Sequence, residues 1–142
     1  MNKKLWLGFI AVFVGMCVLG FLIHGVILAS LYQSEAVKVL LRPEADMNSK
    51  MWIYYLTYLI MSFFFTLIFS KGYEGKGIGE GVRFGFYVGV LMATPMAYAS
   101  YAMYPLPYSL AMQWFLYGVI EYIILGVIVA AMFGKKAPAV AA

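Results

Sequence analysis

Four long apolar blocks divide this chain and constrain its fold more than any other feature. They cover residues 5–31, 51–70, 82–104 and 108–133, and each contains 20 residues or more. An α-helix of about 20 residues, rising about 1.5 Å per residue, spans a hydrocarbon core of about 30 Å. The blocks therefore predict an all-α polytopic membrane protein, with four transmembrane helices in an antiparallel bundle that forms a single domain.

The composition excludes an ordinary soluble domain. Apolar residues make up 65% of the 142 residues, and only 11% are charged. A typical soluble domain has about 25% charged residues on which its solvation depends. We therefore expect the lipid bilayer to surround most of this chain.

The first block begins like a secretory signal peptide, because Lys3 and Lys4 precede an apolar run. Residues 5–31 are too many for the hydrophobic region of such a peptide, which has about 7–15 residues. We therefore expect the block to stay attached as the first spanning helix. Cys17 lies within it and is the one cysteine of the chain, so no internal disulfide is expected.

Basic residues are concentrated on one side of the predicted bundle. Lysine and arginine resist translocation, so the richer side is normally cytoplasmic. One side carries three basic residues: Lys38, Arg42 and Lys50. The other side carries seven: Lys3, Lys4, Lys71, Lys76, Arg83, Lys135 and Lys136. This split predicts a multi-pass protein of the inner (plasma) membrane with both termini cytoplasmic. Anionic lipid head groups account for the excess positive charge, and no nucleic-acid partner is expected.

The predicted outer loop, residues 32–50, joins the first two blocks. Its three basic and three acidic residues balance each other. Ser34 is suited to cap the start of a helix, and Pro43 cannot continue one. We expect a short amphipathic helix over residues 34–42 that lies at the membrane interface.

Small residues recur at every fourth position along the third block and the end of the loop before it. They are Gly77, Gly81, Gly85, Gly89, Ala93 and Ala97. Such a stripe, a glycine zipper, lets two helix backbones approach closely in lipid. The short connection at residues 105–107 makes the third and fourth helices neighbours. The stripe either packs within the chain or docks another chain, and the sequence leaves both open.

Pro95 lies near the middle of the third predicted helix. Proline removes a backbone hydrogen bond and clashes with the preceding turn, so we expect a kink there. Thr94 or a nearby tyrosine is expected to bond the freed carbonyl groups. The kink serves either as a fixed bend or as a hinge.

Glu121 is the acidic residue that the sequence places at mid-membrane depth. An ionised carboxylate is costly there, so Glu121 is either protonated or partnered. Tyr117 and Tyr122 lie nearby on the same predicted helix, and His24 lies on the first helix. These four side chains form a candidate intramembrane polar site that relays a proton or lines a cavity. The alternative is a neutral Glu121, bonded to a tyrosine or a backbone carbonyl, that only fixes helix register.

Aromatic residues gather where the predicted helices meet the membrane interface. Tyr32 and Tyr54 belong to this belt. Trp114 lies deeper, and its indole nitrogen is expected to require a partner such as Gln113 of another helix or a bound ligand.

Other site chemistry has little support in the sequence. One histidine and one cysteine cannot build a metal cluster, and the ten methionines are expected to pack as apolar side chains. The inner glycine-rich loop, residues 71–81, lacks the Gly-Lys-Ser/Thr ending of a phosphate-binding loop. No nucleophile and base set is recognisable, so we expect neither a cofactor, nor a metal, nor enzymatic activity.

The plan of two helical hairpins with a glycine-rich turn before the third helix, chiefly residues 72–89, resembles a family of small bacterial four-helix membrane proteins of unknown function. The resemblance extends over most of the chain. It implies a fold and leaves the activity open.

Two functions from different classes remain as hypotheses. The first is a structural or accessory subunit that packs through its small-residue faces into a homo-oligomer or a larger membrane complex. The second is a small transporter or channel with a proton or ion path through Glu121 and His24.

Overall fold

The protein is entirely helical in its regular secondary structure. A computed structural model describes residues 3–134, and within that range it contains no strand. The predicted all-α class is therefore confirmed. Lys135 and Lys136, which we assigned to the basic side, lie outside the described residues.

Long helices form the body of the molecule and short ones form its connections. The long helices are α1 (Lys3–Gly20), α5 (Met51–Gly72), α6 (Ile78–Thr94) and α8 (Tyr108–Phe133). The short segments are the π-helix η1 (Phe21–Ile27), α2 (Ala29–Tyr32), α3 (Glu35–Lys38), α4 (Glu44–Ser49), the π-helix η2 (Pro95–Ala99) and α7 (Ser100–Met103).

Three helices are long and apolar enough, by length and composition, to cross a membrane. They are Lys3–Ile27, Glu44–Gly72 and Tyr108–Phe133. The structure thus supports a helical membrane protein with three candidate spans. The regular part of α6 has 17 residues because the helix becomes π-helical at Pro95, and it is not among the three. A fourth crossing stays a prediction.

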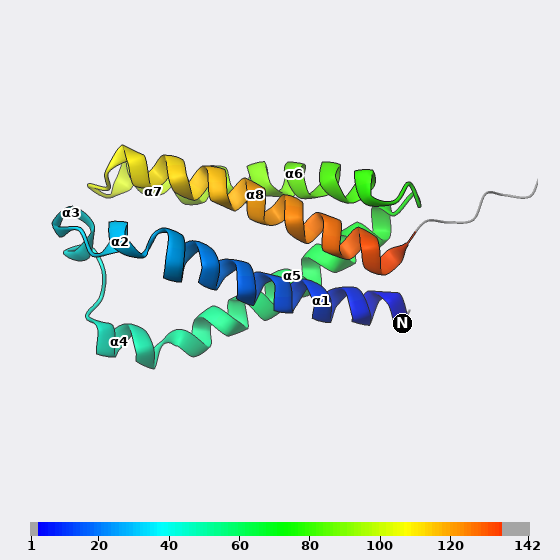
Figure 1. Ribbon diagram of the computed structural model, residues 1–142, viewed down its shortest axis with the longest axis horizontal. Coiled ribbons are helices and arrows are strands. Elements are labelled where there is room, and N and C mark those ends of the chain that lie inside the picture. Colours follow the sequence, from blue (N-terminus) through cyan, green and yellow to red (C-terminus); the bar gives the residue numbers. More distant parts are fainter. Residues whose placement is uncertain (1–2, 135–142) are drawn as a thin grey trace, which may run out of the picture.

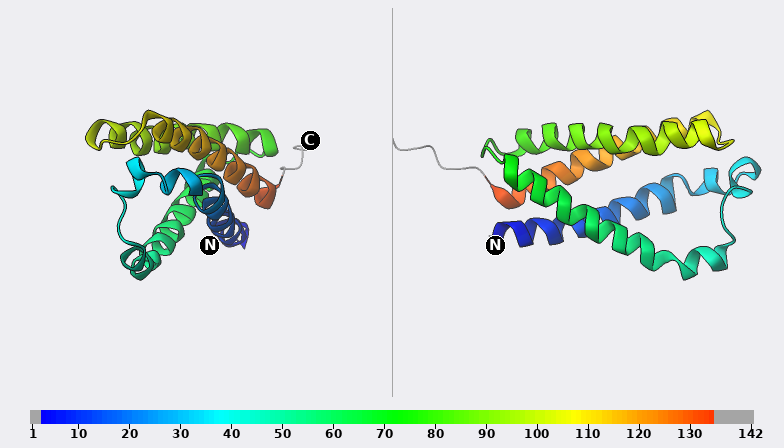
Figure 2. Two further views of the ribbon diagram at one scale, coloured as in Figure 1. Left: turned by 60° about the vertical axis from the view of Figure 1, so that its left-hand side comes forward. Right: turned by 180° about the vertical axis from the view of Figure 1, so that it is seen from behind.

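The four long helices run lengthwise through the molecule (Figure 1). The start of α1, the turn at residues 73–77 and the end of α8 lie together at one end, which we name the Phe133 end. The segments α2 to α4 and the connection at residues 104–107 lie at the other end, the α3 end. α1 and α5 cross each other and lie further apart toward the α3 end (Figures 1 and 2).

The observed elements differ from the predicted ranges at several points. Regular α-helix in the first block ends at Gly20, and the helical course is interrupted at Leu28. Of the helix expected over residues 34–42, only α3 forms. Ser34 stands at its N-cap position, but its hydroxyl donates to the Leu31 carbonyl at 2.7 Å instead of capping. Pro43 then starts α4, which was not expected.

The small-residue stripe of α6 packs directly on α8. Its buried members are Gly81, Gly85, Gly89, Ala93 and, in η2, Ala97. A Cβ on Gly81 would collide with the carbonyl oxygen of Gly126, and one on Gly85 with the carbonyl oxygen of Tyr122. The two backbones therefore touch, and this face is occupied by α8 within the same chain.

The turn before α6 is held by the carboxylate of Glu80. Its oxygens accept hydrogen bonds from the backbone N–H groups of Glu74 at 2.6 Å, Gly75 at 3.0 Å and Lys76 at 2.9 Å. Gly75 and Gly77 have φ of 86° and 83°, the left-handed region that favours glycine. Gly77 therefore precedes α6 and does not belong to the helical stripe, which corrects the prediction. The loop donors that a phosphate would need already bind Glu80.

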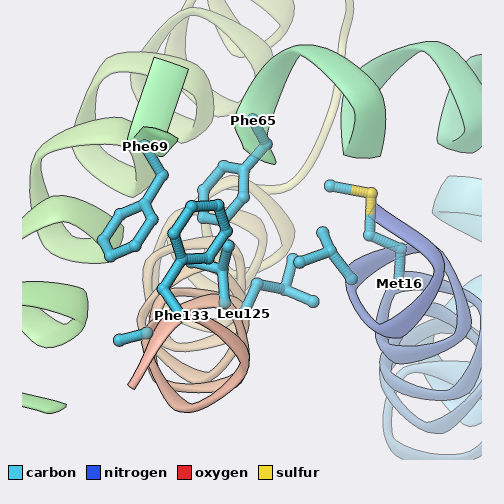
Figure 3. Close-up of a cluster of buried hydrophobic side chains, with 8 residues drawn as sticks. Met16, Phe65, Phe69, Leu125 and Phe133 are labelled. Carbon is cyan, nitrogen blue, oxygen red and sulfur yellow. The ribbon is translucent and has the colours of Figure 1, made fainter. Parts of the chain in front are cut away.

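Buried hydrophobic side chains form a core cluster (Figure 3). Its members on α5 and α8 belong to the second halves of these helices, so the core lies toward the Phe133 end. Phe65 and Phe69 from α5 meet Phe133 from α8, and the rings of Phe69 and Phe133 are 5.3 Å apart. The backbone carbonyl of Phe133 accepts hydrogen bonds from Lys4 Nζ at 2.5 Å and Tyr73 Oη at 3.2 Å. The first and last long helices are thereby joined at this end.

Candidate functional site

A cavity of about 300 Å³ lies between the long helices. Its lining comes from α1 with η1, from α5, from α6 with η2, and from α8. On α5 the lining residues extend from Tyr54 to Met61, in the first half of that helix, and on α8 from Trp114 to Tyr122. The cavity therefore occupies the half of the molecule toward the α3 end, whereas the packed core occupies the other half.

Three of the four predicted polar-site residues lie on this cavity. His24 reaches it from η1, and Glu121 and Tyr122 reach it from α8. Tyr117 is half-buried elsewhere on α8 and does not line it. The fold thus brings together two ionisable groups, Glu121 and His24, that are far apart in the sequence.

The rest of the wall is mainly apolar and aromatic. Tyr54, Tyr58 and Trp114 contribute rings, and Thr57 contributes a hydroxyl. Four methionines also line it: Met16, Met61, Met92 and Met96. No lysine or arginine is among the lining residues of the described chain, so Glu121 faces no opposite charge there.

His24 takes part in a hydrogen-bonded chain that the sequence did not reveal. Trp114 Nε1 donates to Tyr32 Oη at 2.8 Å, and Tyr32 Oη lies 2.6 Å from His24 Nδ1. Gln113 instead donates to its own helix, to the Ser109 carbonyl. The partner of Trp114 is therefore Tyr32, which we had placed in the aromatic belt.

The break after η1 makes this chain of contacts possible. In a straight α-helix, residues 24 and 32 would be about 12 Å apart along the axis. Here the wide turns of η1 and the interruption at Leu28 stack the two rings, with centroids 6.0 Å apart and planes inclined by 17°. No regular pattern in the sequence indicates such a pairing.

The bond between Tyr32 and His24 is compatible with either tautomer of the imidazole. Burial raises the pKa of Tyr32 to about 12, so its hydroxyl keeps a proton to donate. The Trp114 indole can only donate, and the Tyr32 oxygen therefore accepts from it. The hydroxyl proton of Tyr32 is available to Nδ1 of His24, which lies within hydrogen-bond distance of the same oxygen.

Glu121 has no such partner. Its half-buried side chain makes no hydrogen bond or ion pair with any residue between 3 and 134. In particular, it bonds neither Tyr117 nor Tyr122 on its own helix. The bond to a tyrosine or backbone carbonyl that would merely fix helix register is thus missing from this part of the chain, and the carboxyl group faces an apolar cavity.

Both π-helical segments border the cavity. Ile23 and His24 in η1 and Met96 in η2 are lining residues. π-Helical turns are often found at functional sites because they widen the helix and redirect side chains. At the start of η2, the Thr94 hydroxyl donates to the Val90 carbonyl at 2.7 Å, beside the position where Pro95 offers no N–H. A bend at Pro95 stays a prediction.

The core closes the cavity toward the Phe133 end. Met16 belongs both to the cavity wall and to the core. Leu125, one turn beyond Glu121 on α8, is fully buried in the core. Glu121 therefore lies where the cavity meets the core.

Comparison with known proteins adds no family to these observations. No protein-family model matches the chain, and neither the curated proteins nor the solved structures include a match. Between residues 3 and 134, no group of three histidine, cysteine, aspartate or glutamate side chains is placed to hold a metal ion. The cavity is therefore the feature of this chain that bears on its function.

Proposed function

We propose that this chain is a small inner-membrane transport protein in which Glu121 binds the transported proton or cation. The observation that carries the proposal is the shared cavity of Glu121 and His24, in which Glu121 has no partner within residues 3–134. A carboxyl group is expensive at this depth, and unpartnered ones in membrane proteins typically belong to proton or ion pathways.

The proposal includes a fourth crossing by the helical run of α6, η2 and α7. These segments follow each other without interruption from Ile78 to Met103 and lie beside α8 (Figure 1). At about 1.5 Å per residue they are long enough for a core of about 30 Å. Both ends of the described chain then lie on one side of the membrane.

The distribution of charge supports a cytoplasmic Phe133 end. The segments at that end contain Lys3, Lys4, Lys71, Lys76 and Arg83. The α3 end carries fewer basic residues, and Asp46 pairs with two of them, Arg42 and Lys50. By the positive-inside rule, the cavity then faces the outer side and the core seals the cytoplasmic side.

Transport with this arrangement requires that Glu121 becomes accessible from each side of the membrane in turn. Glu121 lies where the cavity meets the core, and the rings of Phe65, Phe69 and Phe133 lie beyond it, toward the Phe133 end. A transported ion leaves toward the cytoplasm only when α5 and α8 separate at these rings. The two π-helical segments and Pro95 are where the long helices can bend to allow it.

The accessory-subunit hypothesis has less support, because its motivating stripe packs on α8 within the chain. A homo-oligomer or a larger complex stays a prediction that would need another face. Such an assembly is compatible with transport, since each copy would retain its own cavity.

Proton flux into proteoliposomes tests the proposal. The purified chain is reconstituted with an internal pH-sensitive dye, and a potassium diffusion potential drives protons inward. We expect flux above that of empty liposomes, reduced at least tenfold by Glu121→Gln and unchanged by Glu35→Gln, whose side chain is exposed on α3. Equal flux in Glu121→Gln and the parent, or parent flux at the level of empty liposomes, would overturn it.

A further inference from the structure

The cavity is larger than a proton or a bare inorganic ion requires. Its volume of about 300 Å³ is at the lower end of the range of small-molecule sites, about 300–1,000 Å³. Hard metal cations are held by about six to eight oxygen ligands, whereas the wall here is dominated by thioethers and rings. The ligand that fits this space is organic.

The charge of the wall selects the sign of that ligand. Glu121 is the one acidic residue on the cavity, and no lysine or arginine lines it. A carboxylate in an apolar site is stable only beside a positive charge. His24 does not pair with Glu121 in the described structure, because its Nδ1 is bonded to Tyr32 Oη at 2.6 Å and no ion pair joins the two side chains. A bound monocation would neutralise the site.

The remaining side chains match an apolar cation. Tyr54, Tyr58 and Trp114 offer ring faces that attract positive charge, most strongly where water is excluded. Methionine side chains are flexible and polarisable, so the four on this wall can adapt to ligands of different shape. A strongly hydrated ion would gain little from either group.

From these features we propose that the cavity binds a lipophilic organic monocation, with Glu121 as its counter-ion and the aromatic rings as its walls. The inference rests on the proposed transport function, for which it names the class of cargo. Protons compete for the same carboxylate, so a bound proton and a bound cation exclude each other at Glu121.

The competition gives a definite pH dependence. The titratable groups facing Glu121 across the cavity are His24 on η1, Tyr54 and Tyr58 on α5, and Tyr122 on α8; α6 and η2 contribute none. Added protons remove the negative charge of Glu121 and place positive charge on His24. Both changes weaken the binding of a cation, so its affinity falls as the pH is lowered.

Tryptophan fluorescence can report the binding directly. Trp114 lines the cavity, whereas Trp6 and Trp52 are exposed and do not. The double variant Trp6→Phe and Trp52→Phe leaves Trp114 as the reporter. The full chain in neutral-lipid nanodiscs is titrated at pH 8 with benzyltrimethylammonium and with neopentylbenzene, its uncharged isostere. Empty nanodiscs give the partitioning baseline.

We expect saturable binding of benzyltrimethylammonium, a Kd at least tenfold higher in Glu121→Gln, and recovery of binding in Glu121→Asp. The affinity for neopentylbenzene should be weaker and the same in all three proteins. Equal affinity for the two probes, an unchanged Kd in Glu121→Gln, or no saturable signal would overturn the inference.

The flux assay contains no organic cation, and its result therefore separates the two proposals. Glu121-dependent proton flux without probe binding would remove the cargo class and leave the transport function. Glu121-dependent probe binding without flux would remove transport and leave a binding site.

Discussion

At the scale of single residues, two glutamates of this chain have opposite environments. Glu80 is buried at the Phe133 end, where its carboxylate accepts three backbone N–H bonds. Glu121 faces a cavity and has no partner between residues 3 and 134. A satisfied carboxylate stabilises the fold, whereas an unsatisfied one is available to a ligand or a proton.

Glu80→Gln should therefore destabilise the protein and leave the cavity intact. The amide keeps one acceptor oxygen, but its NH2 group cannot accept from the loop donors that the second carboxylate oxygen binds. Hydrogen bonds to a charged group contribute about 1.5–3 kcal/mol each, so we expect a loss of about 2 kcal/mol. Thermal unfolding in detergent, with Glu35→Gln as the control, measures it. An unchanged midpoint for Glu80→Gln would contradict this role.

Glu80 could have been found from the sequence, and Tyr32 could not. Glu80 stands three residues after Gly77, the N-cap of α6, which is the spacing of a capping box. For the glycine-rich loop, the sequence argued against a phosphate-binding motif but did not predict that Glu80 binds the backbone of the turn. The pairing of Tyr32 with His24 depends on η1 and the interruption at Leu28. Neither feature can be recognised from the α-helical periodicity of apolar residues in the sequence.

At the scale of elements, the backbones of α6 and α8 lie in direct contact. Gly81 and Gly85 of α6 touch the backbone of α8 at Gly126 and Tyr122. The sequence predicted both the stripe and the hairpin that places it. The choice between internal packing and external docking required the coordinates, because a four-residue repeat is the same in either case.

Two glycines of α6 provide a matched test of this packing. A Cβ at Gly85 would meet the backbone of Tyr122 and Ile123, whereas a Cβ at Gly79 would meet nothing within 4 Å. Overpacking of this kind typically costs about 1–3 kcal/mol. We expect Gly85→Ala to lower the unfolding midpoint and Gly79→Ala to leave it unchanged or raise it slightly. Equal midpoints for the two variants would show that α6 and α8 do not pack this closely.

Helix boundaries matched the predicted ranges where the sequence contains residues that start or stop a helix. α8 spans Tyr108–Phe133, the same residues as the predicted helix, because Pro107 precedes it and Gly134, with φ of 69°, follows it. The first block has no such signals. Its change to π-helix at Phe21 occurs within an unbroken apolar run, so composition alone could not place it.

At the scale of the whole molecule, the hydrophobic core and the cavity lie in different halves. The core lies toward the Phe133 end and the cavity toward the α3 end. The proposed orientation places the half that contains the cavity on the outer side of the membrane. This orientation requires that α6, η2 and α7 together cross the membrane.

Cysteine labelling in intact cells tests that crossing. In a Cys17→Ser background, a membrane-impermeant maleimide should label Ser49→Cys and Leu106→Cys, which lie in segments of the α3 end. Lys76→Cys, in the turn at the Phe133 end, should react only after permeabilisation. Protection of Leu106→Cys together with Lys76→Cys would mean that the segment between them returns without crossing.

The bond from Lys4 to the Phe133 carbonyl bears on the order in which the protein is assembled. A ribosome delivers the first helix to the membrane long before it makes the last one, so α1 waits without its final neighbour while α5 and α6 are inserted. The hairpin of α6 and α8 is local and can close as soon as both helices have emerged. The last step of assembly is therefore the packing of α1, the first helix to be made, against α8, the last.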